Sequence, residues 1–287
     1  MLECQTLKTK YQTLKNLQKE FELELTNAIK SGKTEKAQKL KKEIEQKLSN
    51  LKRELLPKKF VAIFVNPETK TEEKKEIDAE KAIAEQSEFY EKHNIKNFDE
   101  NEVWRIFKKH KKEIQKEMET YGYDNITIIP AKLPTTEELN QKMTGDYAKT
   151  WKSESFDGKE GLNIIVHAES QKTKIILTHS DQYIYENDEA NPFLKETLEK
   201  SFNRLNTEKI HGLSLNEYLI IQRQYYENKK THLDKIGWTW LPQSCSPYSN
   251  SVVIARWDDI RKRLVIRSND WDESDKDLGC RLCKTFE

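Results

Sequence analysis

The sequence predicts an α+β protein in three parts: a helical hairpin over residues 1–57, a helical linker region with one strand over residues 58–120, and a strand-rich domain over residues 121–287. Two patterns support this prediction. Before Pro57, apolar residues recur at three- and four-residue steps, as they do along one face of a helix. After Trp238, short apolar runs alternate with polar residues, as they do in half-buried strands.

The composition indicates a soluble protein. Of its 287 residues, 34% are charged and 35% are hydrophobic, and the mean hydropathy is -0.92. The net charge of +1 gives little reason to expect attraction of the whole protein to nucleic acid or to a membrane. No run of about 18 apolar residues predicts a transmembrane helix, and no apolar signal region follows Met1. We therefore expect a cytoplasmic protein without a nucleic-acid or membrane partner, and association with a virion or a cell surface stays open.

Residues 1–57 are expected to form two helical arms joined at residues 31–34. Gly32 suits a left-handed C-cap, Thr34 suits the N-cap of the second arm, and Pro57 ends that arm. Arms of similar length predict an antiparallel coiled coil, or one that pairs with another chain. Two interpretations stay open: a helical spacer, and an element for homo-oligomerisation or for docking a partner.

The remainder of the chain combines apolar runs with capping and turn signals. Asp99 and Ser214 are each followed by Glu three residues later, a capping-box spacing, and Gly122 suits the end of the first of these helices. Helices are predicted over residues 77–92, 99–121, 135–143, 192–202 and 214–226. Strands are predicted over residues 59–65, 125–129, 162–166, 174–178, 238–241, 251–257, 263–267 and 279–282. The strands over 162–166 and 174–178 are expected to pair with each other.

Neither cysteine nor histidine gives a metal pattern. Cys280 and Cys283 have the C-x-x-C spacing, but a zinc site needs four ligands and the chain has no second such pair. Buried structural cysteine is the interpretation that we favour. The 6 histidines form no metal-binding motif, and His167 and His179 are expected to meet across a strand pair in a structural role. We expect no metal and no cofactor.

The last fifty residues carry a resemblance to a known family. The matching segments are Ala255–Asp258, Arg263–Asn269 and Leu278–Leu282. In order and spacing they resemble the C-type lectin fold, in the branch shared by formylglycine-generating enzymes and the variable proteins of diversity-generating retroelements. The chain departs from that branch where Ala255 and Arg256 replace the glycines before Trp257, and where Cys280 replaces an aromatic residue.

The resemblance implies a C-type lectin-like ligand-binding domain over residues 121–287, in which buried alternate side chains hold the strands and outward ones are free to vary. Adenine-directed mutagenesis of Asn codons would yield the Tyr, Ser, Asp and Arg found here, although ordinary loops favour Ser, Asn and Asp as well. Trp238 and Trp240 are expected in the core, whereas Trp257 is left open between core and ligand anchor. The expected ligand-binding surface residues are Tyr248, Asn250, Arg256, Asp258, Asp259, Arg261, Arg267, Asn269, Asp270 and Trp271.

The function that we expect is therefore non-enzymatic: display of a variable C-terminal surface that binds a protein or another macromolecule. One alternative is an oxidase related to formylglycine-generating enzymes, which needs a reactive cysteine pair before the second matching segment, where residues 252–262 hold none. A second alternative is a calcium-dependent, carbohydrate-binding lectin-like module, for which Asp258, Asp259 and residues 269–273 offer oxygen ligands.

Overall fold

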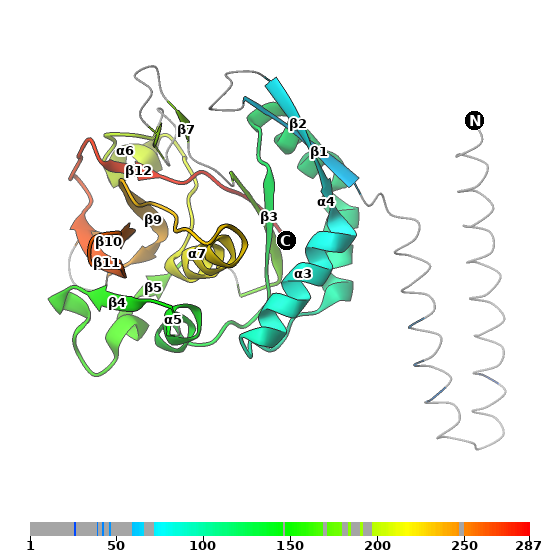
Figure 1. The fold of residues 1–287 in the computed structure, drawn as a ribbon, viewed down its shortest axis with the longest axis horizontal. Coiled ribbons are helices and arrows are strands. Elements are labelled where there is room, and N and C mark those ends of the chain that lie inside the picture. Colours follow the sequence, from blue (N-terminus) through cyan, green and yellow to red (C-terminus); the bar gives the residue numbers. More distant parts are fainter. Residues whose placement is uncertain are drawn as a thin grey trace. The chain divides into compact units, whose positions relative to one another are not determined.

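The computed structural model describes residues 59–65, 72–145, 147–168, 171–179, 183–184, 190–191, 197–246 and 250–287, together with the single positions Thr26, Lys39, Lys42 and Gln46. The chain divides into two units, Met1–Lys58 and Lys59–Glu287. The predicted hairpin over residues 1–57 lies outside the described residues, apart from those single positions. Residues 59–287 form a mixed α+β unit, in agreement with the predicted class (Figure 1).

The unit begins with an antiparallel hairpin of β1 (Lys59–Val65) and β2 (Glu72–Asp78). The predicted strand over residues 59–65 is confirmed. Strand β2 was not predicted, because its sequence is almost entirely charged and shows no apolar alternation. It forms because β1 supplies the ladder partners, while the buried Phe60 of β1 packs against Phe107 with ring centroids 5.5 Å apart.

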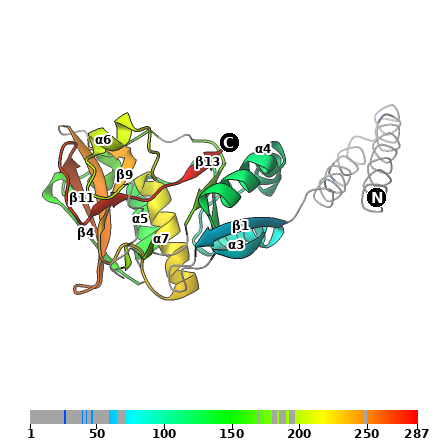
Figure 2. The same cartoon turned by 90° about the horizontal axis from the view of Figure 1, so that it is seen from above.

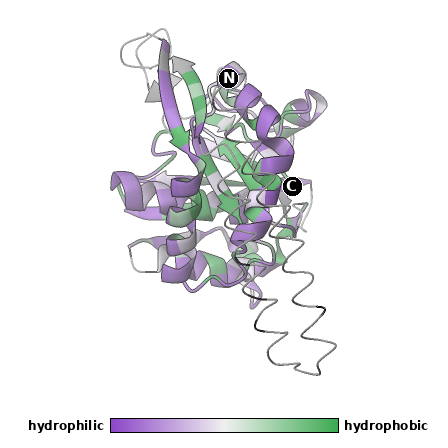
Figure 3. Cartoon of the chain, turned by 90° about the vertical axis from the view of Figure 1, so that its right-hand side faces the viewer, coloured by the Kyte–Doolittle hydropathy of each residue, from purple (hydrophilic) through white to green (hydrophobic). Residues whose placement is uncertain are grey.

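Two helices follow where the sequence predicts helices, and the second begins at its predicted cap, Asp99. Helix α3 (Ala79–Lys92) begins at Asp78, and α4 (Glu100–Tyr121) begins at Asp99; each aspartate accepts hydrogen bonds from two backbone N–H groups of the first turn. Gly122 ends α4 with a φ of 70°, in the left-handed region that glycine adopts readily. Figure 3 shows that these outer helices carry long hydrophilic stretches, whereas the strands behind them are mainly hydrophobic.

A three-stranded antiparallel sheet has the order β13 (Lys284–Phe286), β6 (Lys174–Thr178), β3 (Asn125–Ile129). Strands β3 and β6 are where the sequence predicts them, but the predicted partner of β6 over residues 162–166 is wrong. Residues 161–164 form a 3-10 turn, η2 (Gly161–Ile164), and only Val166–His167 forms a short strand, β5, which pairs elsewhere. Gly161 takes a φ of 54°, and the Leu162 N–H donates to the Glu137 carboxylate, so the chain turns at these residues and does not continue as a strand.

A larger sheet has the order β12 (Leu278–Cys280), β9 (Trp238–Cys245), β10 (Ser251–Asp258), β11 (Arg263–Asp270), β4 (Lys149–Lys152), with β5 attached to β9. Strands β9, β10 and β11 form an antiparallel meander, whereas β4 and β12 run parallel to their neighbours. The four tail strands predicted from the sequence are confirmed. Two short strands, β7 (Tyr183–Ile184) and β8 (Ala190–Asn191), form a separate pair, and η1 (Glu154–Phe156) adds a single turn.

Helix α7 (Leu215–Lys229) lies between the two sheets, beside α5 (Thr136–Thr144), as Figures 1 and 2 show. Both helices have a capping box, at Thr135 and Ser214, as predicted. Every residue of α7 from Leu215 to Arg223 is buried. The main core lies around this helix and includes the side chains of β10 and β11 that point toward it, namely Val253, Ala255, Trp257, Leu264 and Ile266.

The other side of β10 is also buried along half of its length. Val252 and Ile254 pack with Trp240 and with Leu205 of α6 (Phe202–Thr207) in a second cluster. The sequence predicted a strand with one outward face, which is wrong for residues 252–255. The cover comes from α6, which was predicted over residues 192–202; the described part of that range, residues 197–201, holds a turn and an N-cap, and the helix begins at Phe202.

The described structure does not separate residues 59–120 from the remainder. Helix α4 packs against β1 on one side and against β6 and β13 on the other, through buried residues that include Ile114 and Met118. The predicted boundary at residue 120 therefore falls inside one compact unit. None of the helices in the described part of the chain combines the length and the apolar character that a membrane span requires.

Candidate functional site

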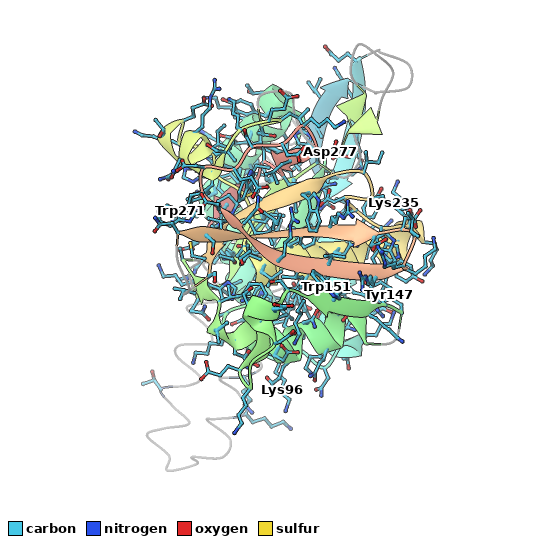
Figure 4. All side chains as sticks on the ribbon, turned by 90° about the vertical axis from the view of Figure 1, so that its left-hand side faces the viewer. Lys96, Tyr147, Trp151, Lys235, Trp271 and Asp277 are labelled. Carbon is cyan, nitrogen blue, oxygen red and sulfur yellow. The ribbon has the colours of Figure 1, made fainter. Side chains whose placement is uncertain are left out.

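One side of the larger sheet is turned away from α7 and is only partly covered. We call it the outer face and define it by five side chains: Trp151, Trp238, Arg256, Arg263 and Arg267. Arg256 on β10 pairs with Val265 on β11, and Val265 pairs with Trp151 on β4, so these three side chains point to the same side of the sheet. Arg263 and Arg267 lie two residues before and after Val265 on β11, so they point to that side as well. Figure 4 looks onto this side of the sheet, with Trp151 on β4 and Trp271 beyond the end of β11.

Two guanidinium groups converge on one indole at this face. The Cζ atom of Arg256 lies 4.5 Å from the ring centroid of Trp238, and that of Arg267 lies 4.1 Å from it. Both distances are typical of cation–π contacts. The Nε atoms of both arginines are shielded from solvent and have no hydrogen-bond partner among the described residues. Burial lowers the pKa of Arg267; the charge of Glu273 acts in the opposite direction, and the neighbouring Arg256 lowers the pKa further.

A second aromatic–arginine pair lies toward β4. Arg263 lies over Trp151, with Cζ 5.4 Å from the ring centroid, and 40% of Trp151 is exposed. Arg263 also has a carboxylate within ion-pair distance: its Nε lies 3.5 Å from the carboxylate of Asp258. Among the described residues, the outer face therefore combines one arginine in an ion pair with two that form none.

Asp258 is not a surface residue, contrary to the prediction from the sequence. Its side chain is only 6% exposed, and it accepts hydrogen bonds from the Arg261 backbone N–H at 3.0 Å and from the Arg261 guanidinium at 3.2 Å. The backbone N–H of Arg261 makes the largest contribution to lowering the pKa of Asp258. This carboxylate orients Arg261 and Arg263 at the end of the sheet and is not available to a ligand.

Asn269 is the second predicted site residue that the structure places inside. It lies opposite Val252 on β10 and is 7% exposed. The sequence could not show this, because Asn269 follows an alternation that points it to the outer side, and burial there depends on cover from another segment. Helix α6 provides this cover, because it packs against the end of the sheet that contains Val252.

The other predicted residues divide by exposure. Asn250, Asp259, Arg261 and Asp270 are exposed, and Arg256, Arg267 and Trp271 are half-buried. Trp271 packs against Phe202 of α6 with ring centroids 5.9 Å apart, so it borders the outer face at the end of the sheet next to α6. Tyr248 lies outside the described residues.

The tryptophans divide between the two sides of the sheet. Trp240 is fully buried, as predicted, whereas Trp238 is only half-buried and belongs to the outer face. Trp257 is 2% exposed and lies on the α7 side, where its ring stacks on His232 with centroids 3.4 Å apart. Trp257 is therefore a core residue and not a ligand anchor.

Sequence reasoning missed three members of the outer face. Trp151 lies on a four-residue strand among lysines, with no alternation to reveal it, and its place depends on parallel pairing with a strand more than 100 residues away. Arg263 was placed in a strand but not in the site, and Trp238 was placed in the core. No local signal separates Trp238 from the core, because it precedes the fully buried Trp240 by two residues and shares its side of β9.

The cysteines near the larger sheet are buried, and two of its acidic residues are bonded to other side chains. Cys280 and Cys283 are buried, as expected; burial raises the pKa of Cys280 to about 12 and that of Cys283 well above its usual range. Among the described residues, no group of three or more His, Cys, Asp or Glu side chains is placed to hold a metal ion. Asp259 pairs with Lys262 at 2.7 Å, and Asp272 accepts a hydrogen bond from Asn203 at 2.6 Å.

His167 and His179 do not meet across a strand pair, because β5 pairs with β9 and not with β6. His167 lies between two hydroxyl groups, with Nε2 2.8 Å from Thr136 and Nδ1 2.8 Å from Ser244. His179 packs against Tyr123, with ring centroids 4.9 Å apart. The two histidines therefore lie in separate places, each in contact with side chains of the fold.

Burial lowers the pKa of His167, His179 and His232 to about 4 each. An unfolded chain takes up these protons near pH 6.5, so below that pH it binds more protons than the folded protein. We expect the free energy of unfolding to be maintained above about pH 6.5 and to fall as the pH is lowered toward 4.

Urea titrations between pH 7 and 4.5 test this expectation. His167→Gln should make the dependence shallower, by about 1.4 kcal/mol per pH unit where the unfolded imidazole is protonated and the folded one is not. Lys96→Gln, which replaces an exposed residue, serves as the control. A His167→Gln protein with the wild-type slope would show that His167 is charged in the fold.

Comparison with known proteins adds no relative. A scan against protein-family models found no match, and searches of curated proteins and of solved structures found none either. A proposal about function therefore depends on the residues of the outer face and on the segments that resemble a known family.

Proposed function

We propose that this chain is a non-enzymatic binding protein and that the outer face of its larger sheet binds a macromolecular ligand. The observation that carries the proposal is the cluster of Trp238 with Arg256 and Arg267, whose two guanidinium groups have no ion-pair partner among the described residues. Trp and Arg dominate the energetics of protein interfaces, and desolvated clusters of them are typical of binding hot spots. The opposite side of the same sheet belongs to the main core, which gives the cluster a rigid support.

The resemblance of residues 255–258, 263–269 and 278–282 supports the same proposal. It implies a C-type lectin-like display domain, in the manner of the variable proteins of diversity-generating retroelements, with outward positions free to vary. Of the ten predicted positions, seven keep enough exposure to serve in this way: Asn250, Arg256, Asp259, Arg261, Arg267, Asp270 and Trp271. Asp258 and Asn269 are withdrawn from the proposed surface.

The enzymatic alternative has less support. An oxidase of the formylglycine-generating type needs an accessible, reactive cysteine, and the raised pKa values of buried Cys280 and Cys283 keep both thiols protonated at neutral pH. Calcium-dependent sugar binding also has less support, because the nearby carboxylates of Asp258 and Asp259 already bind arginine and lysine.

Selection from a random peptide library displayed on phage tests the proposal with the whole protein. Peptides enriched on the wild type are measured against an outer-face variant that combines Trp151→Ser, Arg256→Ser and Arg267→Ser. We expect affinity to fall about 30-fold or more, because loss of a hot-spot residue costs about 2 kcal/mol or more.

A matched control combines Lys108→Ser, Lys111→Ser and Lys112→Ser, all exposed on α4, which lies on the other side of the unit (Figure 1). This control should bind the selected peptides as the wild type does. Equal binding by the outer-face variant would refute the assignment. The diversification component has a separate test: a reverse transcriptase gene near this one, with a near-copy of the DNA for residues 244–283 that differs mainly at adenines.

A further inference from the structure

The cluster of Trp238, Arg256 and Arg267 is electrostatically incomplete. Its two positive charges lie 4.5 Å and 4.1 Å from the centroid of one ring, and neighbouring like charges repel each other when solvent is partly excluded. The pKa of Arg267 is lowered by burial and by Arg256, while Glu273 and Asp275 act in the opposite direction from the neighbouring loop. Neither acid forms an ion pair with Arg267 among the described contacts, and Arg256 and Arg267 are both half-buried, so part of each side chain remains accessible to an external anion.

We infer that Arg256 and Arg267 form a carboxylate-binding centre, and that its occupant is a polypeptide segment of a partner protein which presents an Asp or Glu side chain to the Trp238 cluster. This inference rests on the proposed function, since it names the chemistry of the ligand that the outer face binds.

The geometry of the arginines fits a carboxylate. A guanidinium that stacks on an aromatic ring uses its face for that contact and keeps the N–H groups of its edge for hydrogen bonds. Those edges match the two oxygen atoms of a carboxylate, which Arg binds in bidentate fashion. Trp238 thus holds two such donors in place, and less side-chain entropy is lost when the ligand binds.

The surroundings favour a single carboxylate over a polyanion. The segment after β11 is acidic, with exposed side chains at Asp270, Asp272, Glu273, Asp275 and Asp277. Figure 4 shows Asp277 and Trp271 at the border of the sheet. A nucleic acid or a sulfated glycan would bring many negative charges against this border, whereas a segment with one acidic side chain between neutral residues brings a single one.

The dimensions of the outer face suit a short extended segment. Trp151 on β4 and Trp238 on β9 are separated by three strand spacings, or about 14 Å. A strand-like peptide rises about 3.4 Å per residue, so about four residues span this distance. Trp151 then offers apolar contact to a side chain at the other end of the segment, since 40% of its surface is exposed.

The test measures the response of the indole N–H of Trp238 in the full chain, by nuclear magnetic resonance, with its signal assigned from Trp238→Phe. The probes are two capped peptides, Leu-Glu-Leu-Leu and Leu-Gln-Leu-Leu. We expect the glutamate peptide to shift the Trp238 signal and the glutamine peptide to leave it unchanged. In Arg256→Lys/Arg267→Lys, which keeps the charge but loses the planar donors, the affinity should fall on the order of tenfold; Lys111→Gln/Lys112→Gln should leave it unchanged.

Three outcomes would overturn the inference: equal shifts with both peptides, full binding by the double lysine variant, or a Trp238 response to a heparin fragment or oligo-dT but not to the glutamate peptide. Its failure can be told apart from failure of the proposed function. If phage-selected peptides bind the outer face but lack acidic residues, the proposed binding surface is supported and the carboxylate-binding centre is rejected. If no peptide binds the outer face, the proposed function itself is contradicted.

Discussion

Trp257→Ala is expected to lower the free energy of unfolding by about 3–5 kcal/mol, the cost typical of truncating a buried tryptophan. Trp257 is 2% exposed on the α7 side of β10 and stacks on His232 with centroids 3.4 Å apart. Its indole N–H also donates to Asp259 at 3.3 Å. Alanine would leave a cavity at the centre of the main core and remove all three contributions.

Trp151→Ala is the matched control on the other side of the sheet. Because 40% of Trp151 is exposed, its loss should change the free energy of unfolding by less than about 1 kcal/mol. Urea denaturation followed by circular dichroism measures both variants. Similar destabilisation by the two substitutions would contradict the division of the sheet into a structural side and a binding side.

Glu217→Ala is expected to cost about 3–5 kcal/mol as well, for an electrostatic reason. Glu217 is completely buried, and its carboxylate lies 2.6 Å from the Nζ of Lys174, whose side chain is 3% exposed. The same carboxylate accepts a hydrogen bond from the Ser214 N–H at 2.7 Å and so completes the capping box of α7. Alanine would leave the Lys174 charge without a partner in the core and an unbonded N–H at the helix start.

The ion pair between Lys59 and Glu76 provides a control of equal length, 2.6 Å, whose side chains are 61% and 56% exposed. Glu76→Ala should have little effect, because solvent screens exposed pairs. The double variant Lys174→Met/Glu217→Leu should recover most of the stability lost in Glu217→Ala, since no charge is then left unpaired. If Glu217→Ala is as stable as Glu76→Ala, Lys174 must be neutral or solvated in the fold.

Local signals in the sequence were sufficient to predict those elements whose structure is determined by their own residues. The capping boxes at Thr135 and Ser214, the aspartate cap at Asp99 and the left-handed Gly122 each fixed a helix end that the structure confirms. The strands β9, β10 and β11 were predicted from their apolar runs and alternation, whereas their antiparallel order was not predicted. These features require no knowledge of what packs against them.

Elements that depend on distant partners could not be predicted. Strand β2 has a charged sequence and forms only against β1, and β6 pairs with β3 and β13 because the run after Gly161 turns instead of extending. The site shows the same limit. Alternation placed Arg267 on the side opposite Leu264 and Ile266, but it could not show that α6 covers one end of that side.

The most direct measurement compares two combinatorial libraries of the full chain on yeast. One varies Asn250, Arg256, Arg267 and Asp270 on the partly exposed side, and the other varies Val253, Ala255, Leu264 and Ile266 in the main core. Protease resistance reports the folded fraction, and selection against a protein that the wild type does not bind reports new recognition. We expect most members of the first library to stay folded and some to gain binding, while most members of the second unfold. Equal losses of folding in both libraries, or a folded first library that yields no binder, would contradict the assignment of this surface to ligand recognition.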